Sequence, residues 1–340
     1  MRAAPTGLTL LLLSLAVGQP SAGPVTGPFR LPTPNQALFE PGGESRFFAP
    51  TPGRDWQAGT FGCTRTEGRQ LHEGIDILAT QRDRQGEPTD PVTAAADGVV
   101  VYVNRTPALS NYGRYIVLLH RIEGLNVYTL YAHLRSIADA LRPGQPVRAG
   151  QQIGVVGRST NTRTPIARDR AHLHFEIAFM LSDRFEPWFK RTEPGERNDH
   201  GNYNGQNFVG IDPAEVLRLQ QTLGPRFSLL RHVQGQVPLC TVRLRAVNLF
   251  WVRHYPALVE PAPAGTDPVV GYELTFAYQG LPFRARPITA REWPGQARLQ
   301  LVHVNEAETQ NRPCQRMLVR RGNRWALSSR GERLLDLLAY

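Results

Sequence analysis

Between residues 91 and 180 the sequence consists of apolar runs that are shorter than ordinary helices. The runs are rich in β-branched and aromatic residues and are separated by Gly, Pro and Asn. This texture is typical of strands joined by turns, and it does not show the alternation of strands and helices that βαβ units require. We interpret the following runs as strands: 92–96, 98–103, 115–120, 126–132, 152–156 and 173–179. The sequence therefore predicts an antiparallel β-domain, with one or two helical turns at 136–141.

The length of 340 residues suggests about two domains at roughly 150 residues each. A Pro/Gly-rich lead-in at 19–58 is expected to wrap the edge of the first domain or to stay mobile. The first β-domain is predicted at 59–222, with a polar, irregular insertion or long loop at about 183–210. Asp212 followed by Pro213 is a helix-start signal and predicts a short helix over 212–222.

A second, smaller β-rich accessory domain is predicted over 226–340. Its sequence alternates in a strand-like way and ends in a segment that favours a helix, at 333–339. The predicted strands are 241–252, 269–278, 298–304 and 315–319. The fold class is thus mainly β, an open antiparallel sheet domain followed by a smaller β-rich C-terminal domain.

The N-terminus indicates where the chain works. Arg2 precedes an apolar run at 8–17, and small residues at 16 and 18 offer a cleavage site, with 21–22 as a second option. This pattern predicts a secretory signal peptide at 1–18 and a protein that is secreted or in the cell envelope or periplasm. An uncleaved anchor is the alternative. No cysteine directly follows the run, which disfavours a lipoprotein. No later segment is apolar for 18 residues, so we expect no stable membrane insertion.

The formal net charge is +10, and Lys190 is the one lysine among 39 basic residues. A codon bias toward arginine explains that ratio without any function. The positive sign still attracts polyanions, and nucleic acid, acidic lipid and an acidic wall polymer all qualify. Nucleic acid is disfavoured by the signal peptide and by the lack of a recognisable nucleic-acid-binding module.

Three cysteines occur in the chain. In an oxidising compartment, one disulfide and one free thiol is the simplest arrangement. Because Cys240 and Cys314 share the C-terminal third, we expect them to pair and Cys63 to be a small buried residue.

Four of the nine histidines form a pattern with one aspartate. His72 and Asp76 lie four residues apart, His172 and His174 lie two apart, and His133 lies between these pairs in the chain. On strands, residues an even number apart share a face, so the two pairs can aim at one point. Two imidazoles and one carboxylate suit a catalytic zinc ion with an open position, and two histidines are then left for proton transfer and oxyanion stabilisation.

Several short segments in this region resemble one known family. They are FG at 61–62, HEGID at 72–76, PVTAAADGVV at 91–100, TLYAHL at 129–134, VRAGQQIGVVG at 147–157 and HLHFEI at 172–177. In order and spacing they resemble the LytM/lysostaphin-type zinc metalloendopeptidases, peptidase family M23. Gly-Ile-Asp-Pro at 210–213 is similar to a closing Asp-Pro of that family, displaced by the insertion.

The resemblance implies a mechanism and a site. His72, Asp76 and His174 match the ligands of one Zn²⁺ per chain, and His133 and His172 match the two non-ligating catalytic histidines. It implies a sheet with a groove over the metal, and hydrolysis of peptide bonds in peptidoglycan, in stem peptides or cross-bridges. All five positions are present, which argues against the family's non-catalytic activators. A secreted protease acting on Gly-rich proteins is a further alternative.

The chain departs from the family's pattern before HLHFEI, where 159–171 is long and rich in arginine. Arg163, Arg168 and Arg170 are candidates for binding carboxylates of a stem peptide, and a solvated basic loop is the alternative. Four tryptophans are candidates for sugar stacking or for core packing: Trp188, Trp251, Trp293 and Trp325. We expect His120 to be structural and the chain to be a monomer.

Overall fold

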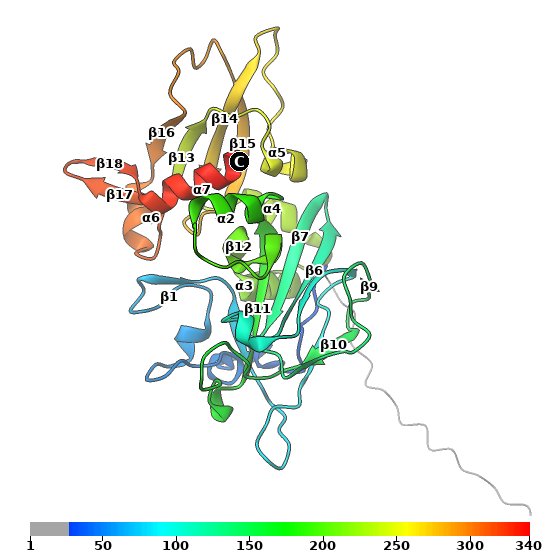
Figure 1. Cartoon of the computed structure of the whole chain (residues 1–340). Helices are drawn as coiled ribbons and strands as arrows, with labels where there is room; N and C mark the ends of the chain where they lie inside the picture. The colour runs from blue at the N-terminus through cyan, green and yellow to red at the C-terminus, as the bar shows by residue number, and fades with distance from the viewer. Residues whose placement is uncertain (1–26) are drawn as a thin grey trace, which may run out of the picture.

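The computed structural model describes residues 27–340 (Figure 1). The predicted signal peptide at 1–18 lies outside the described residues. A large sheet and its attachments form the lower part of the view, and a second sheet with the C-terminal helix forms the upper part. One cluster of buried apolar side chains includes residues of both parts. The division into domains at 222 and 226 therefore stays a prediction.

The main sheet carries the predicted site. It has seven strands in the order β12-β11-β7-β6-β5-β9, and β3 pairs with β11 as well. All of these pairings are antiparallel. The strands are β3 (Ile75–Leu78), β5 (Gly98–Asn104), β6 (Tyr115–Ile122), β7 (Leu125–Ala132), β9 (Pro146–Val147), β11 (His172–Met180) and β12 (Phe208–Ile211). The mainly β, open antiparallel architecture predicted from the short runs is confirmed.

Two smaller sheets flank it. The hairpin β1 (Gly62–Arg65) and β2 (Gln70–His72) precedes β3, and a three-stranded sheet has the order β4-β10-β8. Its strands are β4 (Pro91–Thr93), β8 (Ser136–Ile137) and β10 (Gln152–Val155). The helical turn expected at 136–141 is wrong, because residues 136 and 137 pair with Gly154 and Val155 of β10.

Strand β11 is the central element for the site. All nine of its residues are buried. It lies between β7 on one side and β3 followed by β12 on the other, with His174 opposite both Asp76 and Ala132. The backbone ladder thus brings three distant parts of the sequence to one place in the sheet.

The lead-in packs against this sheet rather than leaving it. Phe29, Phe47 and Phe48 are buried, and the Ala49 amide donates to the Asp76 carbonyl at 2.8 Å. The segment contains α1 (Glu44–Phe47) and the 3₁₀ turns η1 (Ala37–Phe39) and η2 (Trp56–Gly59). For the described residues from 27 onward, the expectation that the lead-in wraps the domain edge is confirmed.

The segment at 183–210 is more ordered than the expected irregular loop. It contains helix α2 (Phe185–Thr192), which buries Trp188 and Phe189, and it ends in β12. Although the segment is polar overall, Phe185, Trp188 and Phe189 are apolar and are spaced so that they share one face of α2. The predicted helix after it is confirmed as α3 (Pro213–Leu223), where the Asp212 carboxylate accepts from the amides of Ala214 and Glu215.

The C-terminal sheet has four antiparallel strands in the order β15-β14-β13-β16. They are β13 (Cys240–Leu244), β14 (Val269–Phe276), β15 (Pro282–Thr289) and β16 (Leu299–Val304), and a separate hairpin is formed by β17 (Leu318–Arg321) and β18 (Arg324–Leu327). The strand expected at 241–252 is wrong beyond residue 244. Residues 250–254 are helical instead and bury Trp251.

The remaining helices are short, apart from the last. They are α4 (Leu229–Gln234), α5 (Phe250–His254), α6 (Glu306–Asn311) and α7 (Ser329–Ala339). Further 3₁₀ turns are η3 (Pro107–Leu109), η4 (Arg168–Arg170), η5 (Gly201–Tyr203), η6 (Gly205–Asn207), η7 (Gly224–Arg226) and η8 (Pro256–Leu258). Across residues 27–340, no helix combines the length and the apolar character that a bilayer-crossing segment needs.

The disulfide joins Cys63 to Cys314, so the expected pairing of Cys240 with Cys314 is wrong. Cys240 is a buried free thiol in the middle of the C-terminal sheet, opposite Phe276 and Val304. Proximity in sequence misled the prediction, because the fold brings β1 beside the segment that follows α6.

Candidate functional site

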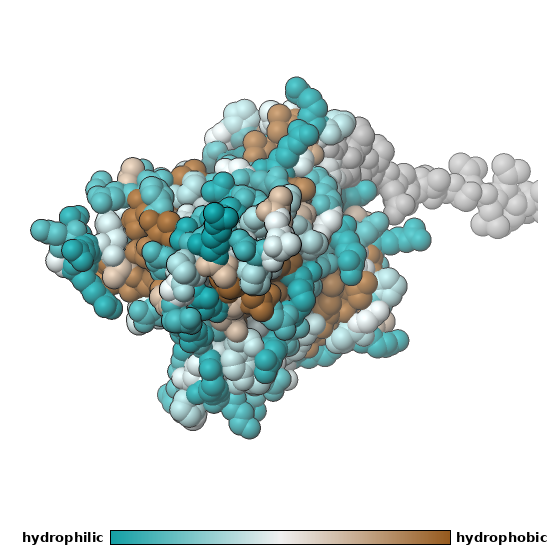
Figure 2. Space-filling view, turned by 90° about the horizontal axis from the view of Figure 1, so that it is seen from above, coloured by the Kyte–Doolittle hydropathy of each residue, from teal (hydrophilic) through white to brown (hydrophobic). Residues whose placement is uncertain are grey.

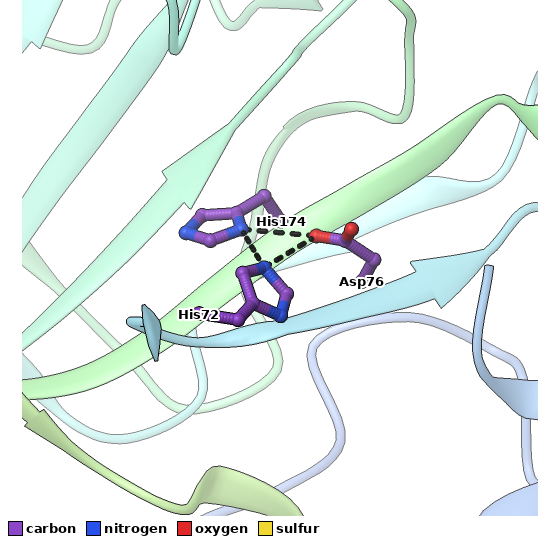
Figure 3. Close-up of side chains that lie close together, drawn as sticks. All are labelled: His72, Asp76 and His174. Atoms are coloured by element: carbon purple, nitrogen blue, oxygen red, sulfur yellow. Dashed lines mark hydrogen bonds and ion pairs between the residues drawn. The ribbon is translucent and has the colours of Figure 1, made fainter. Parts of the chain in front are cut away.

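His72, Asp76 and His174 converge in the way the sequence predicts (Figure 3). His72 ends β2, Asp76 lies in β3, and His174 lies opposite Asp76 in β11. His174 Nδ1 is 2.9 Å from Asp76 Oδ1 and 3.1 Å from His72 Nε2, and His72 Nε2 is 3.3 Å from the same oxygen. All three side chains are buried. One carboxylate oxygen and two imidazole nitrogens therefore face a single point.

The outer nitrogens of the two imidazoles fix their orientation. His72 Nδ1 donates to the Thr60 carbonyl at 2.8 Å, and His174 Nε2 donates to Glu176 Oε1 at 2.9 Å. A neutral imidazole has one proton, so these bonds leave the lone pairs of the inner nitrogens toward the shared point. Histidine ligands of metals are held in this way, with the other nitrogen donating to a carbonyl or a carboxylate.

The shared point favours positive charge. Burial opposes ionisation of Asp76, but the neighbouring imidazoles of His172 and His72, together with hydrogen bonds, hold the pKa of this carboxyl well below its usual range. Burial likewise opposes a charge on His174, yet hydrogen bonds to Asp76 and Glu176 raise its pKa to about 10, so that without a metal ion its Nδ1 carries a proton toward Asp76. An ion at the shared point would take the place of that proton and leave the lone pair of Nδ1 to bind it. Arg65 of β1 adds a cation, because its guanidinium donates to Asp76 Oδ2 and lies 3.1 Å from His72 Nε2.

These residues fit a divalent metal ion by the chemistry of their donors. Two inner nitrogens without protons, 3.1 Å apart, repel each other unless a cation or a proton lies between them. Two His nitrogens and one carboxylate oxygen form a donor set that zinc accepts, with a fourth position open. The group His72, Asp76 and His174 is thus a possible metal site.

The two other predicted histidines face the same place. His172 lies two residues before His174 in β11, and His133 follows β7; the ring centroid of His133 is 5.0 Å from that of His172 and 6.0 Å from that of His174. His133 Nδ1 donates to the Ser159 carbonyl at 2.9 Å, and His172 Nδ1 donates to the Arg170 carbonyl at 2.7 Å. Both Nε2 atoms are therefore left without a proton.

Burial keeps these two imidazoles neutral. Burial, and then the neighbouring histidines His172 and His174, lower the pKa of His133 to about 3. Burial also lowers the pKa of His172, although Asp76 works in the opposite direction. A neutral imidazole with a free Nε2 is an acceptor for a proton, which is the property that a general base requires.

His133 is held in an unusual backbone conformation. Its φ is +60°, in the left-handed region that non-glycine residues seldom adopt. Its amide donates to the Tyr112 carbonyl at 2.8 Å, and its carbonyl accepts from the Ser159 amide at 3.3 Å. Strain of this kind is found at functional sites, where the surrounding structure fixes it.

A groove of about 480 Å³ lies over the five residues. Its walls include residues 50–54 of the lead-in, the β1–β2 hairpin and the loop before β11. Two lining residues escaped the sequence analysis. Arg65 is one, and Tyr112 is the other, whose hydroxyl donates to Glu176 Oε1 at 2.7 Å. Tyr112 has a sequence signal in Asn111-Tyr112-Gly113, a turn directly before a strand, whereas Arg65 has none.

The arginine-rich loop has several roles. Arg168 is exposed and forms an ion pair with Glu87, Arg163 is exposed, and Arg170 lines the groove.

Of the tryptophans, Trp188, Trp251 and Trp293 are buried and thus suit core packing rather than sugar stacking. His120 is buried between the Asp97 carbonyl and the Thr129 hydroxyl, as expected for a structural residue.

Comparison with known proteins gives a family. Residues 70–185 match the model of peptidase family M23. No curated protein matches the sequence significantly.

Among solved structures, a protein described as a glycyl-glycine endopeptidase lytM from Ruminococcus gnavus is 26% identical with a TM-score of 0.29, over 44% of this chain and 47% of that one. A zinc-containing peptidase from Vibrio cholerae is 31% identical with a TM-score of 0.24, over 33% and 29%. The catalytic domain of lysostaphin from Staphylococcus simulans is 22% identical with a TM-score of 0.28, over 47% and 87%.

The chain thus spans less than half the length of the first two of these proteins. The segment matched by the family model includes all five predicted site residues, from His72 to His174. The resemblance predicted from the motifs is confirmed: residues 70–185, about a third of this chain, match the model of peptidase family M23.

Proposed function

We propose that this protein is a secreted zinc metalloendopeptidase that hydrolyses peptide bonds in bacterial peptidoglycan. The observation that carries the proposal is the convergence of five side chains, three with lone pairs on one point and two neutral histidines beside it. His72 Nε2, Asp76 Oδ1 and His174 Nδ1 would hold the ion. Zn²⁺, when bound, supplies a Lewis acid that makes water a nucleophile near neutral pH.

The chain's own residues then move the protons. One of the pair His133 and His172 takes a proton from the attacking water at Nε2, while its Nδ1–H stays anchored on a backbone carbonyl. The protonated ring can give that proton to the leaving amine. The other histidine of the pair lies on the same side and is assigned to the oxyanion of the tetrahedral intermediate, a role that requires a proton on its Nε2 because its Nδ1–H is bound to a backbone carbonyl. The hydroxyl of Tyr112, which lines the same groove, orients Glu176 and through it His174.

The test uses the chain from about residue 19 on purified peptidoglycan. Free amino groups and reducing sugar ends are measured together, with and without a chelator and with zinc added back. We expect amino groups alone to rise, to be lost with the chelator and to be lost in His133→Ala. The matched control is His303→Ala, since His303 is an exposed histidine of β16 outside the site. Reducing ends, or release that His133→Ala retains, would contradict the proposal.

A panel of substrates separates the finer alternatives. The same variants are assayed on stem peptides, on glycine cross-bridges and on a Gly-rich protein, and fragment masses identify the bond. If the Gly-rich protein is cleaved and the two wall substrates are not, the substrate is a protein and not peptidoglycan. Wall binding without release under any condition would favour a non-catalytic activator.

A further inference from the structure

A second cavity lies where the C-terminal helix meets the M23 segment. It measures about 460 Å³ and is formed between α2 and α7, which lie side by side in Figure 1. Phe185 and Trp188 of α2 and Leu334 of α7 form its apolar floor. The Trp188 indole donates to Asp336 of α7 at 2.9 Å, so the two helices are fixed relative to each other. The cavity is therefore a formed feature of the junction.

Three arginines rim this cavity, and two of them lack an acidic partner. Arg333 forms an ion pair with Glu193 and stacks over Trp188 at 4.6 Å. Within residues 27–340, neither Arg316 nor Arg330 lies within ion-pair distance of a carboxylate, and both side chains are exposed. Partial burial, and then the positive charge of the nearby Arg330, lower the pKa of Arg316, while Glu73 opposes this shift. A bound anion would relieve the repulsion between Arg316 and Arg330.

A third cavity lies between this cavity and the groove over the candidate metal site. Glu73 and Tyr112 line both that groove and a neighbouring cavity of about 360 Å³. Gln206, in the segment at 183–210, lines both the neighbouring cavity and the one between α2 and α7. The carboxylate of Glu73 also acts electrostatically on Arg316. Shared lining residues thus relate the groove at the histidines, by way of the neighbouring cavity and Gln206, to the cavity of the two arginines.

We propose that Arg316 and Arg330 form a subsite that binds a carboxylate of the peptide polymer whose scissile bond lies in the groove. This inference rests on the proposed function. A guanidinium binds a planar carboxylate through two parallel hydrogen bonds, and the apolar floor suits the side chains of a peptide. The second part of the chain thereby acts as a substrate-binding unit that extends the groove.

The distribution of charge agrees with this assignment. Residues 226–340 contain sixteen arginines against eight acidic residues, so most of the net charge of +10 lies in this third of the sequence. Some of that charge is outside the cavity. The tip of the β17–β18 hairpin is hydrophilic in the view from above, at the left end of Figure 2, and there Arg321 lies opposite Arg324. These two exposed residues provide a matched control.

The experiment measures sedimentation of the full chain with insoluble peptidoglycan, in a His133→Ala background so that the wall is not degraded. Two double variants are compared, Arg316→Gln/Arg330→Gln and Arg321→Gln/Arg324→Gln. Each removes two positive charges, but only the first pair lines the cavity. The wall is used in two forms, untreated and with its carboxyl groups converted to amides by a carbodiimide and ammonium. The amide form keeps any phosphate groups and loses the carboxylates.

We expect Arg316→Gln/Arg330→Gln to weaken binding to the untreated wall about tenfold, the effect of losing charge-assisted hydrogen bonds. It should change little on the amidated wall, and the control pair should bind like the parent. Equal losses in both pairs would indicate general charge attraction and overturn the subsite. A loss that persists on the amidated wall would assign the ligand as phosphate and overturn the carboxylate. No loss would overturn both.

Cleavage separates this inference from the proposed function. In the chain with His133 intact, KM should rise in Arg316→Gln/Arg330→Gln while kcat is kept. If zinc-dependent cleavage is the same with and without Arg316→Gln/Arg330→Gln, the proposed peptidase activity stands and the proposed subsite is wrong. If wall binding requires the two arginines but no cleavage is detected, the proposed subsite stands and the proposed peptidase activity is wrong.

Discussion

The disulfide between Cys63 and Cys314 connects two residues 251 positions apart and ties the β1–β2 hairpin to the C-terminal part of the chain. The same hairpin carries Arg65 and ends in His72. The link is reinforced by Tyr278, whose ring lies 6.5 Å from that of Phe61 and under the guanidinium of Arg312. One wall of the groove is thus anchored in the C-terminal part of the chain.

Removing this link should destabilise the chain. Cys63→Ser/Cys314→Ser is expected to lower the free energy of unfolding by about 2–4 kcal/mol, because the crosslink restricts the unfolded chain. Chemical denaturation of the oxidised protein measures the change. Cys240→Ala is the control for loss of a cysteine outside the disulfide. Equal midpoints for the parent and the double variant, or a native thiol count above one, would contradict the pairing.

Glu176 should determine how tightly zinc binds. Its Oε1 accepts from both His174 and Tyr112, so Glu176→Gln weakens the orientation of the His174 ring. We expect zinc affinity to fall roughly 10- to 100-fold, the usual effect of losing such an outer partner. Competition with a chromophoric chelator gives the affinity. Glu73→Gln, an exposed neighbour in the same groove, should bind zinc like the parent, and a similar loss there would refute the role of Glu176.

Glu87 should make stability depend on pH below about 4.5. Hydrogen bonds from Arg158 and Arg168 lower its pKa from 4.5 to about 2. A depressed carboxyl pKa stabilises the folded state above the unfolded value, and this contribution fades as the pH falls from 4.5 toward 2. Melting temperature between pH 6 and pH 3 should therefore fall less in Glu87→Gln than in the parent.

The control for this pH effect is Glu196→Gln, an exposed residue without an ion pair among the described residues. Because Arg158 directly precedes the arginine-rich segment at 159–171 and Arg168 lies in it, Glu87→Gln should also make residues 158–170 easier to cleave by trypsin. Parallel melting curves for Glu87→Gln and the parent across this range would show that the ion pairs contribute nothing.

Gly157 should be required for the position of His133. A Cβ at residue 157 would lie 2.1 Å from the Arg135 amide nitrogen and 2.5 Å from the His133 carbonyl oxygen. Gly157→Ala must therefore shift the backbone that carries His133, and we expect it to cost about 1–3 kcal/mol of stability and to lower peptidase activity. Gly295→Ala, where nothing lies within 4 Å, is the matched substitution. Full activity in Gly157→Ala would show that this backbone can move freely.

The sequence predicts the site better than its surroundings. The even spacing of His172 and His174 places them on one face of β11, as strand geometry requires. His72 ends β2 and Asp76 lies in β3, so even spacing along a single strand does not explain why these two converge. The convergence of the five residues needs the fold as well, since it depends on β11 pairing with both β3 and β7. Their roles as ligands and as acid or base remain proposals.

The errors have physical causes. Phe250–His254 reads as a continuation of a strand, but its aromatic residues pack as one turn of helix with Trp251 inward. Strand β15 begins with Pro282 and contains Pro287, which hides it from a search based on β-propensity. The disulfide could not be found by spacing, because two separate sheets must be placed before Cys63 and Cys314 become neighbours.

The register of β11 against β3 has one more consequence. Asp76 and His174 are direct partners across the two strands, and successive side chains of a strand point to opposite faces. A slip by one residue would turn His174 away from Asp76 and present Leu173 or Phe175 in its place. An ion held by both side chains would therefore stabilise the correctly aligned sheet relative to every misaligned one. Metal binding would in this way favour the native register during folding.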